Sequence, residues 1–184
     1  MKTAAVVLAG GASVRLGEPK QLVRLAGETL LRRAIGTARE AGCVPVVVVL
    51  GADAEQIAAQ CDLSDAVVVV NDQWSDGMAS SIRRGVGALQ EADSVVLMTC
   101  DQPAVTAEHL RALMETGEVT ASAYAGRRGV PAYLPASACA ELMELRGDSG
   151  ARELLGQAAT VELAGGELDI DTVEDLNEAR SRFR

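Results

Sequence analysis

Short apolar runs rich in β-branched residues alternate along the chain with segments in which apolar residues recur every three or four positions. The four runs span residues 3–9, 44–50, 67–70 and 94–100. Each is about four to seven residues long and apolar at successive positions, which is typical of strands buried on both faces of a parallel sheet. The pattern therefore predicts four buried strands in the first half of the chain.

The segments between these runs have helical periodicity. One apolar stripe predicts a helix that ends at Gly42, and its members are Leu30, Leu31, Ala34, Ile35 and Ala38. Residues 54–61 and 78–89 show the same spacing, with Asp53 and Asp76 near their starts, where a carboxylate stabilises the helix dipole. Alternation of strand and helix predicts a right-handed α/β sheet with helices on both faces.

The second half is less regular. The predicted elements are helix 106–115, strands 119–125 and 129–134, helix 136–145, a short helix over 151–155 and a final helix after Thr172. We expect Asp148 to cap the short helix and Thr172 to cap the last one, which has Glu174 and Asp175 in its first turn. Because no Pro- or Ser-rich linker or repeat interrupts the chain, we expect a single domain over residues 1–184.

Composition excludes several classes of function. The chain has 184 residues, 48% of them hydrophobic, which is enough for one domain with a full core. A formal net charge of −9 argues against binding to nucleic acid or to an anionic membrane, because both need a positive face. Residues 3–9 are too short for a membrane span and lack a cleavage site. Four cysteines without a Cys-x-x-Cys pair indicate buried thiols, and we expect a cytoplasmic protein.

The chain contains a single histidine, His109. A histidine-rich metal site, a Ser-His-Asp hydrolase and a histidine-based phosphotransferase all need a residue that is scarce here. His109 lies in a predicted helix beside Leu110 and Leu113, so we expect it to be structural or solvent-facing. The chemistry is expected to come from Asp, Lys, Arg and backbone groups.

A glycine-rich loop follows the first predicted strand directly. It reads Leu8-Ala9-Gly10-Gly11-Ala12-Ser13-Val14-Arg15-Leu16-Gly17-Glu18-Pro19-Lys20. Small residues let backbone N–H groups approach an anion, while Arg15 and Lys20 supply the charge that a triphosphate requires. The spacing matches neither the G-x-G-x-x-G dinucleotide motif nor the Walker motif. The loop is therefore predicted to be a phosphate-binding loop that belongs to neither the dinucleotide-binding class nor the Walker class.

This loop resembles the signature L-A-[AG]-G-x-S-x-R-[ML]-G-x-x-K of the MobA-like nucleotidyltransferases. Further segments match that family in order, namely 71–81, 100–103, 129–131, 147–152 and 169–172. The set is most similar to the molybdenum cofactor cytidylyltransferase branch. The resemblance implies a three-layer α/β sandwich with a mostly parallel central sheet, the Rossmann-like nucleotide-diphospho-sugar transferase (glycosyltransferase-A-like) fold.

The resemblance also implies an activity and a set of site residues. The branch transfers CMP from CTP to molybdopterin with Mg²⁺ as cofactor. The implied nucleotide-binding residues are Leu8, Ala9, Gly10, Gly11, Ala12, Ser13, Arg15, Lys20, Gly77 and Ser81, with the last two near base and ribose. Asp101 is the implied metal ligand and Asp171 a second candidate. Arg15, Lys20 and Asp101 are the residues expected to be catalytic.

The position of Asp101 supports this role independently. It follows the predicted strand 94–100 at the carboxyl edge of the sheet, where ligands bind in open α/β folds and where the glycine-rich loop also lies. Mg²⁺ prefers carboxylate oxygens together with water and substrate phosphates, so one or two Asp residues suffice. Asp169 shares the strand face of Asp171 and is an alternative second ligand.

The scarcity of histidine fits this chemistry. A phosphomonoester has a second pKa of about 6, so it is already an anionic nucleophile at neutral pH and needs no general base. Catalysis then consists mainly of positioning and charge neutralisation by Lys20, Arg15 and the metal.

The acceptor side is predicted from weaker signals at Gly129, Pro131, Asp148 and Arg152. A capped helix start beside Arg152 suits the acceptor's phosphate, and a plain solvated helix start is the alternative. Gly129 and Pro131 either line the pocket or only open a strand. Trp74, the single tryptophan, either stacks on a ring or anchors a loop in the core.

The identity of the base and several rival functions stay open. Gly10 is typical of the guanylyltransferase branch, but the segment from Gly77 to Ser81 lacks that branch's Gly-Pro-Leu-Ala-Gly run, so CTP is favoured and GTP is the alternative. Val130 replaces a polar residue of several cytidylyltransferases, which leaves the acceptor open.

Three other functions are alternatives to the cytidylyltransferase interpretation. They are a sugar-1-phosphate nucleotidyltransferase, an NAD(P)H-dependent oxidoreductase of the nicotine-blue type and a non-catalytic nucleotide-binding partner in cofactor insertion. A cytidylyltransferase of this branch is also expected to contact a molybdoenzyme or its chaperone transiently.

Overall fold

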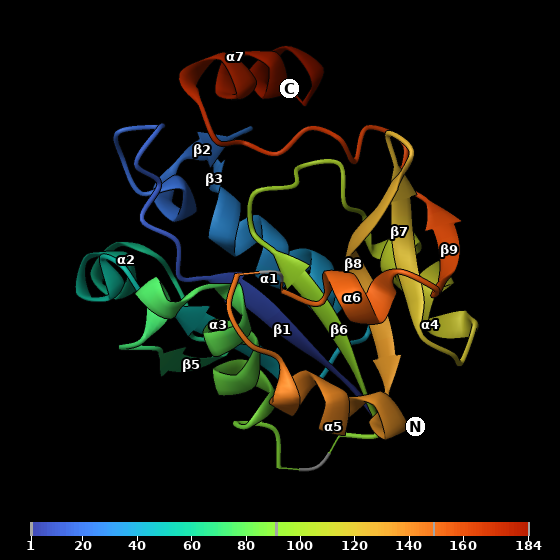
Figure 1. The fold of residues 1–184 in the computed structure, drawn as a ribbon. Helices are drawn as coiled ribbons and strands as arrows, with labels where there is room; N and C mark the ends of the chain where they lie inside the picture. The colour runs from blue at the N-terminus through green and yellow to red at the C-terminus, as the bar shows by residue number, and fades with distance from the viewer. Residues whose placement is uncertain (1, 91, 149, 184) are drawn as a thin grey trace.

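A seven-stranded sheet forms the centre of the computed structural model, which describes residues 2–90, 92–148 and 150–183 (Figure 1). The strands are β1 (Thr3–Ala9), β4 (Val46–Leu50), β5 (Val67–Val70), β6 (Ser94–Thr99), β7 (Thr120–Tyr124), β8 (Arg127–Pro135) and β9 (Ala159–Glu162). Their order is β5-β4-β1-β6-β8-β7-β9, and β8 pairs antiparallel with both of its neighbours while the other pairs are parallel. The predicted mostly parallel sheet is therefore confirmed.

Helices cover both faces of this sheet. They are α1 (Leu30–Glu40), α2 (Ala54–Gln60), α3 (Met78–Val86), α4 (Ala107–Glu115), α5 (Ala136–Glu144), α6 (Arg152–Leu155) and α7 (Val173–Arg182). Buried side chains of α1, α2 and α4 pack on one face and those of α3, α5 and α6 on the other. The three-layer arrangement is thus confirmed. In the part of the chain that the structure describes, no helix is both long and apolar enough to cross a membrane.

A third, smaller apolar cluster lies beyond the carboxyl edge of the sheet. Here α7 packs against the hairpin of β2 (Arg24–Leu25) and β3 (Glu28–Thr29), which the sequence pattern did not predict (Figure 1). Leu16 of the glycine-rich loop belongs to the same cluster as Ile170 and Leu176. The C-terminal segment is therefore held beside the loop.

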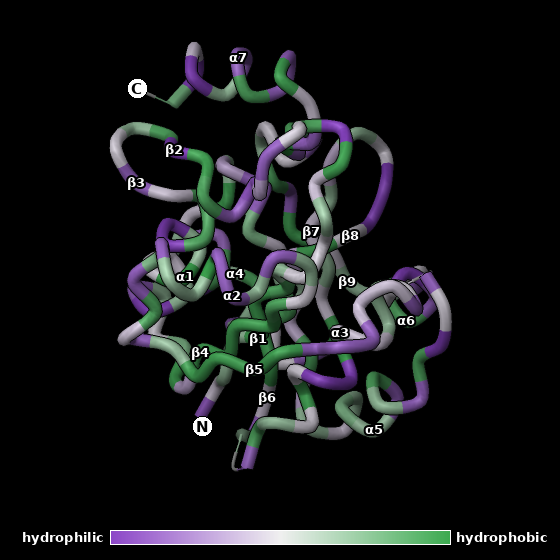
Figure 2. The backbone as a smooth tube through the Cα atoms, turned by 90° about the vertical axis from the view of Figure 1, so that its left-hand side faces the viewer, coloured by the Kyte–Doolittle hydropathy of each residue, from purple (hydrophilic) through white to green (hydrophobic). Residues whose placement is uncertain are grey.

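Alternate side chains of the inner strands point to opposite faces and are buried on both. In β1, Val7 lies in one core cluster and Val6 in the other, and Figure 2 shows β1, β4 and β5 as hydrophobic segments. The prediction of burial on both faces is correct for β1, β4 and β6. It is wrong for β5, where Val67 is 49% exposed, because this edge strand pairs only with β4 and has fewer neighbours to cover it.

Of the two predicted helix caps, one is confirmed and one is wrong. Thr172 caps α7 and forms a capping box with Asp175, as predicted. Thr106, which was not predicted as a cap, accepts a hydrogen bond from the backbone of His109 at the start of α4. Asp148 does not cap α6, which begins after Ala151 without a side-chain cap. Its carboxylate instead accepts a bond of 3.4 Å from the backbone N–H of Met78 at the start of α3.

The loop that carries Asp148 reaches α3 because Gly77 lets the two backbones approach closely. A Cβ on Gly77 would lie 2.6 Å from the carbonyl oxygen of Gly147, and that oxygen accepts a hydrogen bond from the backbone of Ala79. Ser149, part of the matched segment 147–152, lies outside the described residues.

The single histidine and the cysteines have structural surroundings. His109 is buried and its Nε2 lies 2.7 Å from the Ser122 hydroxyl, while burial lowers the pKa of its imidazole. Cys43, Cys61 and Cys100 are buried, as the sequence predicted, and Cys139 is partly buried. These residues therefore contribute to the core.

We expect Gly85→Ala to lower the free energy of unfolding by about 1–3 kcal/mol. A Cβ at Gly85 in α3 would overlap Cγ1 of Val6 and lie 2.8 Å from Cγ2 of Val49, and both valines are buried and conformationally stiff. Urea denaturation measures the change. Gly36→Ala in α1 is the matched control, because a Cβ there meets no atom within 4 Å and should stabilise the helix by about 0.5–1 kcal/mol. Equal effects of the two variants would contradict this close packing.

Candidate active site

The glycine-rich loop leaves β1 at Ala9 and ends at a short 3₁₀ turn over Lys20–Leu22. Ser13 adopts a left-handed conformation, and its hydroxyl accepts a hydrogen bond of 3.0 Å from the backbone N–H of Lys20. The buried Gln21 side chain donates to the carbonyl oxygens of Ala9 at 2.7 Å and Gly11 at 3.2 Å. These bonds fix both ends of the loop. Gln21 was not predicted, although a polar residue directly after Lys20 was its one signal in the sequence.

Lys20 joins the loop to two carboxylates from distant parts of the chain. Its Nζ donates to Oδ2 of Asp101 at 2.8 Å and also forms an ion pair with Asp171. Arg15 donates to the other oxygen of Asp171 at 2.8 Å. The Lys20 side chain is 13% exposed whereas Arg15 is 71% exposed, so Lys20 provides the more sheltered positive charge.

Charge keeps Lys20 protonated despite its burial. Burial lowers the pKa of the ammonium, but the charges and hydrogen bonds of Asp101 and Asp171 outweigh that effect and hold the pKa above its ordinary value. The group is therefore a fixed cation at neutral pH. It lies where the end of β6 meets the segment before α7.

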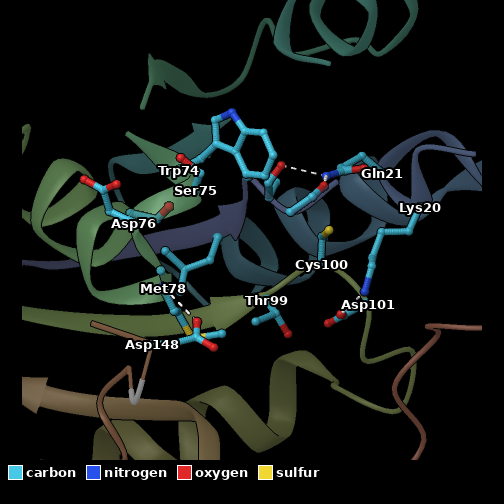
Figure 3. Close-up of a pocket in the computed structure, with 16 residues that line it drawn as sticks. Lys20, Gln21, Trp74, Ser75, Asp76, Met78, Thr99, Cys100, Asp101 and Asp148 are labelled. Carbon is cyan, nitrogen blue, oxygen red and sulfur yellow. Dashed lines mark hydrogen bonds and ion pairs between the residues drawn. The ribbon is translucent and has the colours of Figure 1, made fainter. Parts of the chain in front are cut away.

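A cavity of about 540 Å³ opens on this cluster (Figure 3). The lining residues are Leu8, Ala9, Gly10, Gly11, Lys20, Gln21, Trp74, Ser75, Asp76, Gly77, Met78, Ser81, Thr99, Cys100, Asp101 and Asp148. We call it the loop cavity. Of the residues predicted for nucleotide binding, Ala12, Ser13 and Arg15 are outside this lining. Ser13 and Arg15 contact Lys20 and Asp171 instead.

A second cavity, of about 790 Å³, shares Lys20, Met78, Thr99 and Asp101 with the first. We call it the arginine cavity. Its other lining residues are Gln102, Tyr124, Arg127, Arg128, Gly129, Val130, Ala151, Arg152, Leu155, Gly156, Asp169 and Asp171. The two cavities therefore meet at Lys20 and Asp101.

The structure divides the residues that were predicted for the acceptor. Gly129 and Arg152 line the arginine cavity, whereas Asp148 lines the loop cavity. Pro131 lines neither cavity, because it is buried and its carbonyl accepts a hydrogen bond of 2.6 Å from Ser122.

Two arginines of the arginine cavity were not predicted. Arg127 and Arg128 follow the turn between β7 and β8, and the Arg127 guanidinium lies 5.1 Å from the centre of the Tyr124 ring. The sequence showed the turn itself, but the pairing of β8 with β6 is what brings these side chains to the cavity. Together with Arg152, they make this cavity suited to an anion.

Asp169 carries an unusual carboxyl group on the arginine cavity. Burial, and then the neighbouring charge of Asp101, raise the pKa of Asp169 to about 6. Its nearest cationic partner is Arg127 at 3.6 Å. Asp171, rather than Asp169, forms the ion pairs with Lys20 and Arg15.

We expect Asp169→Asn to stabilise the protein near pH 7.5 by about 1 kcal/mol, or roughly 2–4 °C in Tm, after allowing for solvent screening of this partly exposed group. The raised pKa means that the folded protein retains a proton which the unfolded chain, with a pKa of about 3.9, has released. The stability that this proton contributes is therefore lost as the pH rises from about 4 to about 6, and this contribution is fully lost above that range. Thermal unfolding at several pH values measures it. A benefit from the variant that persists undiminished at about pH 4.5 would contradict the assignment.

The donor set at the junction fits a hard divalent cation. Asp101 and Asp171 both approach one cation, the Lys20 ammonium, and they offer carboxylate oxygens. Among the described residues, no three His, Cys, Asp or Glu side chains form a group that could hold a metal by itself. The arrangement therefore suits an ion that completes its coordination with water and substrate phosphates.

Residues 5–162 match the MobA-like NTP transferase domain, and the chain belongs to this family. Membership of this family supports nucleotidyltransferase activity and nucleotide binding. Among similar proteins, nicotine blue oxidoreductase of Paenarthrobacter nicotinovorans is 35% identical, with 93% of each chain covered. Purine catabolism protein PucB of Bacillus subtilis strain 168 is 30% identical over 95% of this chain and 94% of its own.

Solved structures show the same fold. Rv0371c from Mycobacterium tuberculosis H37Rv superposes with a TM-score of 0.87 and 30% identity, covering 98% of both chains. A complex of Rv0371c with manganese gives a TM-score of 0.80 at 30% identity, covering 98% of this chain and 99% of the other. The fold is the Rossmann-like nucleotide-diphospho-sugar transferase fold, as the sequence resemblance implied.

Proposed function

We propose that this protein transfers a nucleoside monophosphate, preferably CMP from CTP, to the phosphate group of molybdopterin or the molybdenum cofactor and releases pyrophosphate. The observation that carries the proposal is the meeting of the loop cavity and the arginine cavity at Lys20 and Asp101. One cavity offers a phosphate-binding loop and the other an arginine cluster. A triphosphate and an anionic acceptor can therefore approach each other at a shared cation.

We assign the residues of the two cavities to binding of the reactants and to charge neutralisation. Backbone N–H groups of residues 10–13 and the Lys20 ammonium bind the triphosphate, while Arg15 adds positive charge from the exposed side. Arg127 and Arg152 bind the acceptor's phosphate in the arginine cavity. Each cavity thus fixes one of the two reactants, which lowers the entropic part of the barrier.

An oxygen of the acceptor's phosphate attacks the α-phosphorus, and the bond to the β-phosphate's bridging oxygen breaks. The electron pair leaves with pyrophosphate, whose charge Lys20 neutralises. The acceptor is already ionised at neutral pH, so no proton has to be removed from it. His109 accordingly lies in the core with Ser122 and takes no part.

Asp101, together with Asp171 or Asp169, would hold Mg²⁺. When bound, the ion supplies charge neutralisation on the phosphate oxygens. The manganese complex of Rv0371c supports divalent-metal use in this fold.

CTP is favoured over GTP because residues 77–81 lack the Gly-Pro-Leu-Ala-Gly run of the guanylyltransferase branch. Gly10 is the feature that favours GTP. A Cβ there would make only ordinary contacts, 3.4 Å from the Ser81 hydroxyl and 3.5 Å from the backbone of Gly51, so the choice of glycine is not forced by packing.

A second candidate function is NAD(P)H-dependent reduction of an aromatic substrate. The observation in its favour is the similarity to nicotine blue oxidoreductase over 93% of both chains. Tyr124, Val130 and Leu155 give the arginine cavity apolar walls that suit a flat ring. Hydride transfer without a requirement for Mg²⁺ distinguishes this function from nucleotidyl transfer.

A pyrophosphate-release assay tests the two functions side by side. The protein is incubated with Mg²⁺, molybdopterin and each of the four common NTPs in turn, and oxidation of NADH and NADPH is followed in parallel reactions. We expect release with CTP that requires both the acceptor and Mg²⁺. Release with none of the NTPs would overturn the proposal, and consumption of a reduced nicotinamide would then favour the second function.

A further inference from the structure

Trp74 lies on the side of the loop cavity away from its cationic cluster. Figure 3 shows Trp74, Asp76 and Met78 on one side of the cavity and Lys20 and Asp101 on the other. The phosphates of a nucleotide must lie near Lys20, because it is the sheltered cation of the cavity. The base of the same nucleotide is therefore directed toward the side that Trp74 forms.

The first atoms of the Trp74 side chain lie close to the backbone at the carboxyl edge of the sheet. A Cβ on Gly51, the residue after β4, would lie 2.6 Å from Cβ and 2.9 Å from Cγ of Trp74. The same Cβ would lie 2.6 Å from the carbonyl oxygen of Gly10. Gly51 thus lets Trp74 lie beside the first turn of the glycine-rich loop.

The segment that carries Trp74 is held in place by a buried asparagine. Asn71 Nδ2 donates to the hydroxyls of Ser80 at 2.8 Å and Ser81 at 3.0 Å. The backbone carbonyl oxygen of Asn71 accepts a hydrogen bond from the backbone N–H of Trp74 at 3.2 Å. This network ties the Trp74 turn to the first turns of α3. The backbone that carries the indole is therefore held in place by hydrogen bonds.

Trp74 is nevertheless 37% exposed. A large aromatic ring that is fixed but incompletely covered, at the wall of a cavity, is suited to stacking on a planar ligand. A ring whose only role was to anchor the loop would gain more by complete burial.

We propose that Trp74 positions the nucleotide by stacking its indole on the nucleobase. This inference rests on the proposed function, because it assumes that the loop cavity takes an NTP. Stacking is tolerant of base identity, so Trp74 contributes affinity and orientation and leaves the choice between CTP and GTP to other contacts.

Calorimetric titration with CTP, GTP and inorganic tripolyphosphate, each with Mg²⁺, tests the role of Trp74. We expect Trp74→Ala to weaken binding of both nucleotides by roughly 10- to 100-fold and to leave tripolyphosphate binding within about twofold, because only the nucleotides carry a base. Trp74→Phe should retain most of the affinity. Met143→Ala is the matched control, since this exposed apolar residue of α5 is outside the loop cavity.

Fluorescence provides an independent reading, because Trp74 is the single tryptophan of the chain. Nucleotides should quench its emission and tripolyphosphate should not. Equal affinity of Trp74→Ala and wild type for CTP and GTP would overturn the proposal. An equal loss of tripolyphosphate affinity in Trp74→Ala would also overturn it, because Trp74 would then act by holding the loop in place. Nucleotide binding with stacking but no pyrophosphate release would instead overturn the transfer reaction alone.

Discussion

Lys20→Ala is expected to lower kcat of nucleotidyl transfer by roughly 10³-fold, with a smaller effect on KM for the NTP. Lys20 is the sheltered cation where the two cavities meet, and charge on the leaving pyrophosphate increases as the reaction proceeds. Its contribution is therefore greatest in the transition state. Steady-state pyrophosphate release at saturating and limiting CTP separates kcat from KM.

Two further variants sharpen this test of Lys20. Arg24→Ala removes an exposed cation that donates a hydrogen bond to the carbonyl of Gly27 in the hairpin, away from both cavities, and it should retain wild-type turnover. Lys20→Arg should recover part of the lost activity, since it restores the charge with a different shape. Near-normal turnover of Lys20→Ala would remove Lys20 from the catalytic machinery.

Asp101→Asn is expected to reduce turnover by roughly 10³-fold and to weaken binding of Mg²⁺ or Mn²⁺ in the presence of the NTP. The amide keeps the shape of the side chain but loses its negative charge. In the wild type that charge lies beside Lys20, with Oδ2 of Asp101 2.8 Å from Nζ of Lys20. Metal titration followed by Mn²⁺ electron paramagnetic resonance provides a measurement separate from turnover. Unchanged metal affinity together with full activity would contradict the assignment.

The same titration decides between the two candidates for a second ligand. If Asp171 is the ligand, Asp171→Asn weakens metal binding and Asp169→Asn does not. The reverse order would assign the role to Asp169, whose carboxyl faces the arginine cavity and pairs with Arg127.

The sequence predicted those parts of the site that lie next to a buried strand. The glycine-rich loop follows β1 and Asp101 follows β6, and both strands are inner strands whose apolar runs are easily recognised. Because parallel strands end at one edge of a sheet, the meeting of Lys20 with Asp101 followed from local pattern and topology together.

Features that depend on contacts between distant segments were missed. Asp148 bonds to the start of α3 because Gly77 lets two loops approach closely, which no local cap rule describes. Arg127 reaches its cavity only through the antiparallel pairing of β8 in a largely parallel sheet. The exposure of β5 likewise reflects its place at the edge, since its sequence resembles that of an inner strand.

The most direct test of the proposed activity is mass spectrometry of the acceptor after incubation with CTP and Mg²⁺. We predict that molybdopterin gains one cytidylyl group and that one pyrophosphate appears for each adduct formed. Lys20→Ala should form the adduct far more slowly under the same conditions. An acceptor of unchanged mass with CTP and with GTP, in a preparation that binds these nucleotides, would contradict nucleotidyl transfer to molybdopterin.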